Sequence, residues 1–328
     1  MPDAALALKA PIVLSDLLRP RPVQPHLAIL VYHQVLEQPD PLRPGVTLRA
    51  PFAERMKLLR RHFNPVSLAE GVRRLQEGTL PPRCVCITFD DGYADNLTVA
   101  APILAEHGIP ATVFVAPGFL DGGVMWNDRV IEAIGRARQD VVDLDFLELG
   151  TFALGSAGDR RAAIRATLRT LKYRPLDARL ALVGQLERRL AASMPDSPML
   201  STAQLRELAR QGVTIGAHTC HHPILRCEED ARAQAEIENS KSWLEDLLQD
   251  SVRFFAYPNG RRGADYDARH VSMVEAAGFA AAVSTDNGLN RERSHSLQLH
   301  RFTPWDSSPV RFGLRLIANE FRAGGGAA

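Results

Sequence analysis

Short, uninterrupted apolar runs alternate with helical segments along this chain, and this rhythm constrains its fold more than any other feature. Residues 27–32, 84–89 and 111–116 read Leu-Ala-Ile-Leu-Val-Tyr, Cys-Val-Cys-Ile-Thr-Phe and Ala-Thr-Val-Phe-Val-Ala. Strands that are apolar at successive positions are typical of a sheet covered on both faces. Helical periodicity at 51–62 and 96–106 lies between these runs. The pattern therefore predicts an α/β fold, with helices packed on a parallel sheet.

The α/β rhythm is interrupted at about 121–200 and then resumes with strand patterns at 212–217, 254–257 and 280–284. The interrupting stretch is rich in arginine and helical in character, with little strand signal. We expect a helical insertion whose arginines form a solvated face. The alternative is that they line a groove for an anionic substrate or carrier.

The bulk composition excludes several classes of protein. The 328 residues include 39 basic and 38 acidic ones, which gives no electrostatic case for nucleic acid or an anionic membrane surface. No apolar run approaches the roughly 18–20 residues of a membrane-spanning helix. The apolar pieces among the first 25 residues are interrupted by Lys9, Pro11 and Asp16, which makes a poor signal peptide. The pattern favours a cytoplasmic protein over the alternative, a secreted one.

These observations divide the chain into an N-terminal extension over 1–25, a main domain over 26–312 with the insertion at about 121–200, and a C-terminal tail over 313–328. The four cysteines are too few for a disulfide scaffold at this length. Nothing in the pattern specifies an oligomeric state.

Two groups of side chains could carry chemistry. Asp90 and Asp91 come where the apolar run 84–89 stops at Gly92, and His218 and His222 follow the run 212–217. If residues 218–222 begin a helical turn, both imidazoles lie on one face and can share a cation. One carboxylate and two histidines form a metal site with room for water, which leaves the second carboxylate free to act as a base.

His33 and Tyr257 also fall at the ends of predicted strands, where function collects in α/β sheets. A lone Asp-Asp-Gly is often only a turn, and a lone pair of histidines is often structural; their common placement favours a site. His33 faces either this site or the core. Trp126 either stacks on a sugar ring or packs in the interior.

The chain resembles the polysaccharide deacetylases, the carbohydrate esterase family 4 group with the NodB homology domain. The motifs Thr88-Phe89-Asp90-Asp91-Gly92-Tyr93 and His218-Thr219-x-x-His222-Pro223 carry the likeness. The segments 30–33 and 255–260 are similar to a subgroup associated with bacterial exopolysaccharide. The resemblance covers roughly 27–120 and 200–303 and leaves the helical insertion outside.

The resemblance implies a distorted (β/α)7-like barrel and a role for each motif residue. Asp90 would be the general base, and the backbone N–H of Tyr93 would help to hold the oxyanion. Asp91, His218 and His222 would bind a divalent metal, most plausibly zinc, although cobalt and nickel suit the same ligands. We expect substrate contacts from a further set of residues: His33, Trp126, Tyr257, Pro258 and Asn259.

The chain departs from the family pattern at two places. Many members carry an arginine in the third motif, where this chain has Ala256, so either Arg301 or Arg253 would supply the guanidinium that orients the base. The last family motif pairs a histidine with an aspartate, but here His300 is followed by Arg301. His300 either protonates the leaving amine or is a strand residue that faces away from the site.

The function implied is a metal-dependent hydrolase that removes N-acetyl groups from amino sugars of a bacterial polysaccharide or its precursor. A second hypothesis keeps the site and changes the substrate, to give a deformylase or an amidase acting on a lipid-linked sugar or a small amide. A third is a non-catalytic carbohydrate-binding protein. The intact set of Asp90, Asp91, His218 and His222 favours an enzyme.

Overall fold

The computed structural model describes residues 26–191, 197–304, 306 and 308–322. The extension expected over 1–25 lies outside these residues, as do residues 323–328 of the expected tail. Among the residues described, no helix combines the length and the apolar character that crossing a membrane requires.

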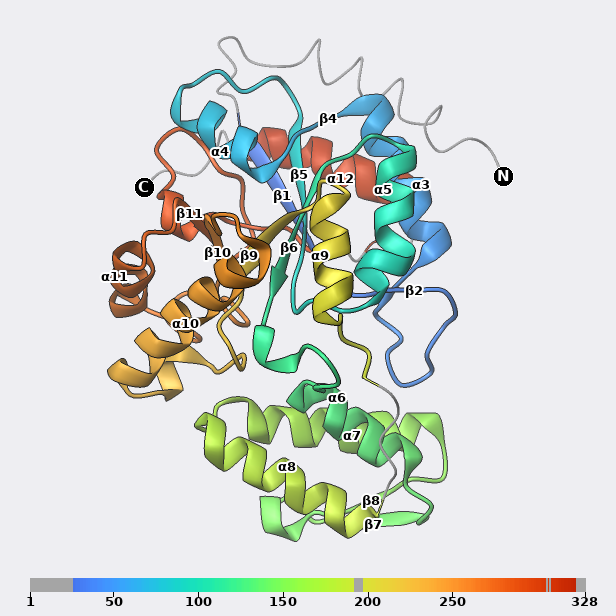
Figure 1. Ribbon diagram of the computed structural model, residues 1–328. Helices are drawn as coiled ribbons and strands as arrows, with labels where there is room; N and C mark the ends of the chain where they lie inside the picture. Colours follow the sequence, from blue (N-terminus) through green and yellow to red (C-terminus); the bar gives the residue numbers. More distant parts are fainter. Residues whose placement is uncertain (1–25, 192–196, 305, 307, 323–328) are drawn as a thin grey trace.

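A parallel sheet forms the centre of the molecule (Figure 1). Its strands follow the order β1 (Leu27–Tyr32), β5 (Cys84–Phe89), β6 (Ala111–Val115), β9 (Thr214–Ala217), β10 (Phe254–Ala256) and β11 (Ala281–Val283), and the short β4 (Asn64–Pro65) pairs with β5. Each neighbouring pair in this sheet is parallel. The pairing confirms the fold class that the apolar runs predict.

The last part of the barrel wall closes the sheet on itself. Leu299 forms a parallel bridge with Val283 of β11, and Phe302 forms one with Leu30 of β1. The preceding residues form a 3-10 helix, η5 (Ser296–Gln298), so this wall consists of two isolated bridges rather than a continuous strand. The result confirms a distorted barrel of the expected (β/α)7-like kind.

Alternation along the strands separates an inner core from an outer one. Ile29, Cys84 and Cys86 belong to the buried cluster inside the barrel, whereas Val85 and Ile87 belong to a larger cluster beneath the covering helices. Because both faces of the strands are buried, every position of β1 and β5 can be apolar. The same alternation directs Thr88 and Asp90 toward the barrel axis.

The helices that cover the barrel are α3 (Arg49–His62), α4 (Leu68–Gln76), α5 (Ala101–Glu106), α9 (Thr202–Arg210), α10 (Asp230–Leu248), α11 (Ala268–Ala276) and α12 (Pro309–Arg322) (Figure 1). Ser67 caps α4 by accepting a hydrogen bond of 3.2 Å from the Glu70 N–H. The segment expected to be one helix over 96–106 begins instead as a π-helical turn, η1 (Asn96–Ala100).

The domain boundary expected at residue 312 lies within a helix. It falls inside α12, and Phe312, Leu316 and Ile317 on that helix are buried in the same core as the barrel's outer face. Their spacing puts them on one apolar stripe of the helix, which packs against α3. The described part of the expected tail is therefore part of the domain.

Residues 121–200 contain a helical unit that lies on one side of the barrel, at the bottom of Figure 1. It consists of α6 (Trp126–Arg136), α7 (Ala157–Lys172) and α8 (Leu176–Leu190) around a buried cluster of its own. A small antiparallel hairpin of β7 (Val141–Asp143) and β8 (Thr151–Ala153), which the sequence did not reveal, joins α6 to α7. The hairpin is short and largely exposed, so it leaves little apolar alternation to recognise.

Candidate active site

A pocket of about 440 Å³ opens where the strands of the barrel end. Asp90 and Asp91 follow β5 directly, and His218 follows β9. The residues that line the pocket are His33, Asp90, Asp91, Met125, Trp126, Asn127, Leu168, Arg169, Lys172, His218, His222, Asn259 and Thr285. The carboxyl ends of the strands and the helical unit thus form its two walls.

The turn after β5 aims two adjacent carboxylates into this pocket. Asp91 and Gly92 both have positive backbone φ angles, 77° and 87°. A positive φ is uncommon for a non-glycine residue, so the conformation at Asp91 requires support from its surroundings. With the chain bent in this way, Asp90 and Asp91 both reach the pocket although adjacent strand residues point to opposite faces.

The histidine segment reaches the same place by a route that differs from the expected helical turn. Thr219 and His222 have left-handed φ angles of 61° and 52°, which fold 218–222 into a tight loop. The Thr219 hydroxyl accepts a hydrogen bond of 3.1 Å from the His222 N–H. The rings of His218 and His222 then lie 4.8 Å apart, centroid to centroid. Two residues in the left-handed conformation, rather than a helical turn, therefore bring the imidazoles together.

Glu236 on α10 fixes the rest of this loop. One of its carboxylate oxygens accepts hydrogen bonds from the N–H groups of Cys220 (2.8 Å) and His221 (2.7 Å). Its other oxygen lies 2.7 Å from Nδ1 of His221. The His221 ring is therefore bound to Glu236, away from the imidazole pair. No sequence pattern signals this contact, since the glutamate belongs to an ordinary amphipathic helix.

Asp91, His218 and His222 form a buried group with the geometry of a metal site. Asp91 Oδ1 lies 3.4 Å from His218 Nε2 and 3.5 Å from His222 Nε2. One candidate ligand atom from each residue lies within 4.8 Å of those of the other two. His218 Nδ1 lies 2.7 Å from the Ala256 carbonyl oxygen, a contact that holds the ring with Nε2 toward Asp91.

An unsatisfied buried oxygen makes this group fit a cation. Asp91 Oδ1, which faces the Nε2 atoms of both histidines, is buried and has no hydrogen-bond partner among the described residues. Buried polar atoms are rarely left in this condition without a function. A carboxylate with two imidazoles is a donor set suited to zinc, and it leaves coordination positions open. These three residues would hold such an ion.

The electrostatics of Asp91, His218 and His222 follow from burial and from one another. Burial acts to raise the pKa of Asp91, but the neighbouring imidazoles outweigh it and lower that pKa. Burial lowers the pKa of His222 to about 3, so this ring is neutral at physiological pH. At His218 burial acts in the same direction, but the negative charges of Asp90 and Asp91 outweigh it and raise the pKa.

Asp90 is held by a different partner. Both of its carboxylate oxygens accept hydrogen bonds of 2.6 Å from the guanidinium of Arg301, and both side chains are buried. Burial acts to raise the pKa of Asp90, but the charges of Arg301 and His218 lower it. Of the two arginines considered for this role, Arg301 reaches the carboxylate. Arg253 is exposed and comes just before β10, at the opposite end of the strands.

Three of the residues expected to contact substrate line the pocket: His33, Trp126 and Asn259. Tyr257 and Pro258 do not. The Tyr257 ring stacks on Tyr266 at 3.8 Å, and its hydroxyl donates to the Leu297 carbonyl at 3.0 Å, so the side chain belongs to the core. Pro258 is buried beside it.

His300 is not brought to the pocket. Its neighbour Arg301 points into the barrel, and successive residues of an extended chain point to opposite sides. The His300 N–H and carbonyl both bond to the side chain of Asn290, at 2.8 and 2.9 Å. The ring packs where Gly288 leaves room for it, since a Cβ on that glycine would lie 2.9 Å from the ring. The alternative interpretation of His300, as a residue facing away, describes this position.

The backbone N–H of Tyr93 forms no backbone hydrogen bond within the described residues. Its neighbours take part in a bridge in which the Leu200 N–H donates to Gly92 and the Ala94 N–H donates to Pro198. The Tyr93 N–H falls between these bonds and has no backbone acceptor among the described residues. The Tyr93 hydroxyl donates to Asp128 at 2.8 Å, which fixes the residue from its other end.

The helical unit contributes more to the pocket than expected, through Met125 and Asn127 beside Trp126 and through Leu168, Arg169 and Lys172 of α7. Lys172 is paired with Asp265 at 3.2 Å. The sequence signals of this wall were Trp126 and the arginine-rich composition of the insertion. Composition alone does not show which face of a helix meets a pocket.

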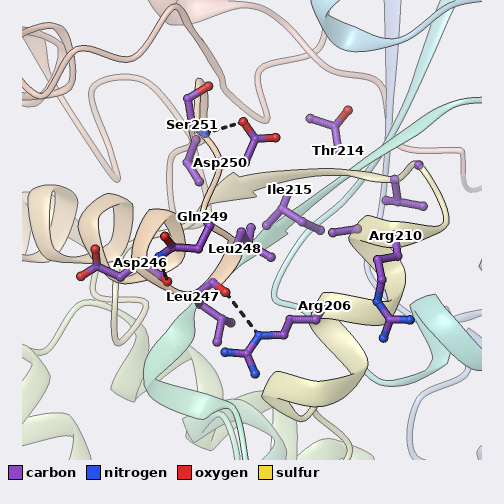
Figure 2. Close-up of a pocket in the computed structure, with 14 residues that line it drawn as sticks. Arg206, Arg210, Thr214, Ile215, Asp246, Leu247, Leu248, Gln249, Asp250 and Ser251 are labelled. Atoms are coloured by element: carbon purple, nitrogen blue, oxygen red, sulfur yellow. Dashed lines mark hydrogen bonds between the residues drawn. The ribbon is translucent and has the colours of Figure 1, made fainter.

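A second hollow, of about 850 Å³, lies at the other end of the strands (Figure 2). It is formed by the end of α9, the start of β9, the last residues of α10 and the residues that follow that helix up to Val252. Its polar groups bond locally: Asp250 accepts from the Ser251 N–H at 2.7 Å, and Arg206 donates to the Leu247 carbonyl at 3.3 Å. None of its lining side chains, all of them described, has a buried polar atom without a partner.

The chain is similar to known proteins in both sequence and fold. The family model described as polysaccharide deacetylase matches residues 77–137 and 151–282, more than half of the chain. This match runs through most of the helical unit, which the sequence motifs alone leave outside the likeness. The curated protein YxkH of Bacillus subtilis (strain 168), a putative polysaccharide deacetylase by its name, is 22% identical over 280 residues, which cover 84% of this chain and 70% of YxkH.

Two solved structures have the same fold. The deacetylase PplD of Streptococcus pyogenes, solved in complex with acetate, is 19% identical with a TM-score of 0.60 and covers 90% of this chain and 99% of its own. IcaB of Ammonifex degensii is also 19% identical, with a TM-score of 0.58, and covers 90% of this chain and 97% of its own.

Proposed function

Because this chain belongs to the polysaccharide deacetylase family and is a hydrolase of that class, we propose that it removes N-acetyl groups from amino sugars in a bacterial polysaccharide or its precursor, with a divalent metal at Asp91, His218 and His222. The observation that carries this proposal is the buried Asp91 oxygen that has no hydrogen-bond partner among the described residues and faces two imidazoles. A divalent ion bound there would polarise the acyl carbonyl and make a water molecule more acidic.

Asp90 is placed to act as the general base. Its carboxylate lines the pocket beside the metal ligands and is kept ionised by Arg301. It accepts one proton from the attacking water as the water oxygen bonds to the amide carbon. Arg301 holds both carboxylate oxygens in place, which favours a single orientation of the base.

The Tyr93 N–H supports the developing negative charge. It is the backbone donor at the turn that carries Asp91, and it has no competing backbone acceptor in the described part of the chain. A donor that is already oriented stabilises an oxyanion without reorganisation during the reaction. The bond between the amide carbon and the sugar nitrogen then breaks, and that nitrogen takes up a proton and leaves as an amine.

His33 is the residue we assign to proton donation. Three histidines line the pocket, and two of them are the metal ligands His218 and His222. His33 follows β1, its side chain is exposed to the pocket, and the Asn96 side chain holds its carbonyl at 2.8 Å. An imidazole in this position can return to the leaving amine a proton equivalent to the one that Asp90 removes.

The test is acetate release from N-acetylglucosamine oligomers by the metal-stripped protein, before and after zinc is added. The wild type should release acetate only with metal. Asp90→Asn should lose about 10²- to 10⁴-fold in rate while it still binds zinc. Asp145→Asn, which makes the same change at an exposed position, is the matched control. Equal release with and without metal would contradict the proposed site.

A further inference from the structure

Arg179 on α8 is a fully buried arginine beside the metal site. Its Nη2 donates a hydrogen bond of 2.9 Å to the backbone carbonyl of His222. Its guanidinium lies over the Trp126 ring, 4.7 Å from the centroid. Burial lowers the pKa of Arg179 to about 10, so the group is still charged at neutral pH. A charge is rarely buried to this extent unless its contacts serve a purpose.

Other contacts fasten the start of α8 to the segment that follows His222. The Leu176 N–H donates to Glu228 at 2.6 Å, and Asp177 forms a two-point ion pair with Arg232, at 2.5 and 2.8 Å. The helical unit is therefore docked on the same stretch of chain that carries one of the three metal ligands.

The contact with Arg179 bears on the orientation of His222. His222 is left-handed, with φ of 52°, and its Nδ1 has no hydrogen-bond partner among the described residues. The ring of His218, in contrast, is held from behind by the Ala256 carbonyl. The His222 ring lacks such a contact, so its direction depends on its backbone. The described contacts that hold this backbone are the Thr219 hydroxyl at its N–H and Arg179 at its carbonyl.

We propose that Arg179 is a positioning residue for the metal site, and that through it the helical unit sets the orientation of His222. The inference rests on the metal site proposed above. It also links metal binding to the pocket wall, because Trp126 lines the pocket while its face supports the guanidinium. Arg179 itself is not among the residues that line the pocket.

The inference is tested with Arg179→Met and Arg179→Lys. Each variant is titrated with zinc in competition with a chromophoric chelator, and with cobalt to record the visible absorption that reports coordination geometry. Thermal unfolding of the metal-free proteins runs alongside. Asp177→Asn is the matched control, because it removes an exposed contact of the same docking surface and leaves the His222 carbonyl bonded.

We expect Arg179→Met to bind zinc about 10- to 100-fold more weakly than the wild type and to change the cobalt spectrum. Arg179→Lys should lie between the two, since an ammonium keeps the charge but lacks the planar fork. Asp177→Asn should bind zinc as the wild type does. If Arg179→Met does not fold, the zinc affinity and cobalt spectrum of Arg179→Lys decide the question.

Two different results would contradict the proposals: one would overturn only the role of Arg179, and the other would overturn the metal site itself. If the Arg179 variants bind zinc as tightly as the wild type with the same cobalt spectrum, then Arg179 supports only folding and the inference is wrong. If the wild type binds no zinc, or if His222→Ala binds it equally well, then the metal site itself is wrong and the proposed function fails with it.

Discussion

The two ends of the barrel each carry a hollow, and the smaller one is the candidate site. The hollow at the amino end, which Figure 2 shows, contrasts with the one at the carboxyl end. Their volumes are about 850 Å³ and about 440 Å³. In the larger hollow, the buried polar atoms of the lining side chains all have partners. In the smaller hollow, Asp91 Oδ1 and His222 Nδ1 are buried and have no hydrogen-bond partner among the described residues. Unsatisfied chemistry, rather than volume, distinguishes a site from a gap between helices.

The largest effect is expected at Asp91, whose unsatisfied oxygen distinguishes the smaller hollow from the larger one. Asp91→Ala removes the carboxylate between the imidazoles, so we expect no tight zinc binding and a rate at least about 1000-fold lower, because the charge of a bound metal is worth several kcal/mol. Acetate release and zinc titration of the same preparation check this. Retained activity with zinc still bound would mean that the unsatisfied oxygen does not mark the site.

A somewhat smaller effect is expected from Arg301→Met. Breaking a buried ion pair costs roughly 3–5 kcal/mol of stability. Without Arg301, burial raises the pKa of Asp90, so the acid limb of the rate profile should move to higher pH. The stability that ionised Asp90 contributes in the wild type is present above its unfolded-state pKa and is lost as pH falls through its lower folded-state pKa. The variant should show less of this acid lability.

The control for this change is Arg49→Met. Arg49 also bonds a carboxylate, that of Glu37, at 2.6 Å, but both side chains are about half exposed. Such a pair contributes about 0–1 kcal/mol. Equal losses of stability and rate in the two variants would mean that burial beside the pocket does not matter. Rates as a function of pH and denaturant unfolding give the answer.

Asp95 offers a contrast within the carboxyl end itself. Burial raises its pKa to about 7 from its ordinary value of 3.8, so the folded protein binds this proton more tightly than the unfolded chain. Its contribution to stability therefore declines as pH rises from about 4 to 7. Asp95→Asn keeps an oxygen for the Val35 N–H and should stabilise the protein by about 1 kcal/mol or more at pH 8.

This gain should be small at pH 5, where Asp95 already holds its proton, and zinc binding should not change. Thermal unfolding at both pH values measures it. A loss of stability at pH 8 would show that the carboxylate, like Asp91, is retained for a charged partner.

The smallest effect is expected at the amino end. Arg206→Ala removes a guanidinium whose described bond is to the Leu247 carbonyl, at an exposed position. Stability should change by no more than about 0.5 kcal/mol, and deacetylation should not change. A loss of activity here, with stability unchanged, would show that the larger hollow has a function of its own.

How much of this could be predicted from the sequence differs between the fold and the site. The strands of the barrel are apolar throughout, so their local pattern identifies them, and the Asp-Asp and His-Thr-x-x-His segments lie at strand ends as predicted. Contacts between distant segments were harder to find. Arg301 and Asp90 are 211 residues apart, and only the absence of an arginine at Ala256 pointed to that pair.

The remaining differences between the sequence predictions and the structure arise from backbone conformations and packing contacts. Tyr257 follows a strand, as a site residue does, but its ring meets Tyr266, which a strand pattern cannot show. His218 and His222 converge through left-handed residues rather than a helix, and sequence spacing alone does not distinguish the two conformations. The insertion's share of the pocket and the buried Arg179 depend on how two units pack, which no local signal specifies.

The metal site is tested most directly by a crystal structure of the protein grown with zinc, with data collected on both sides of the zinc absorption edge. We expect one strong anomalous peak between Asp91, His218 and His222, at about 2.0–2.2 Å from one atom of each. A peak at the larger amino-end hollow instead would contradict a metal site at the carboxyl end. The absence of a peak near these three residues, in a crystal whose other zinc sites are fully occupied, would contradict it as well.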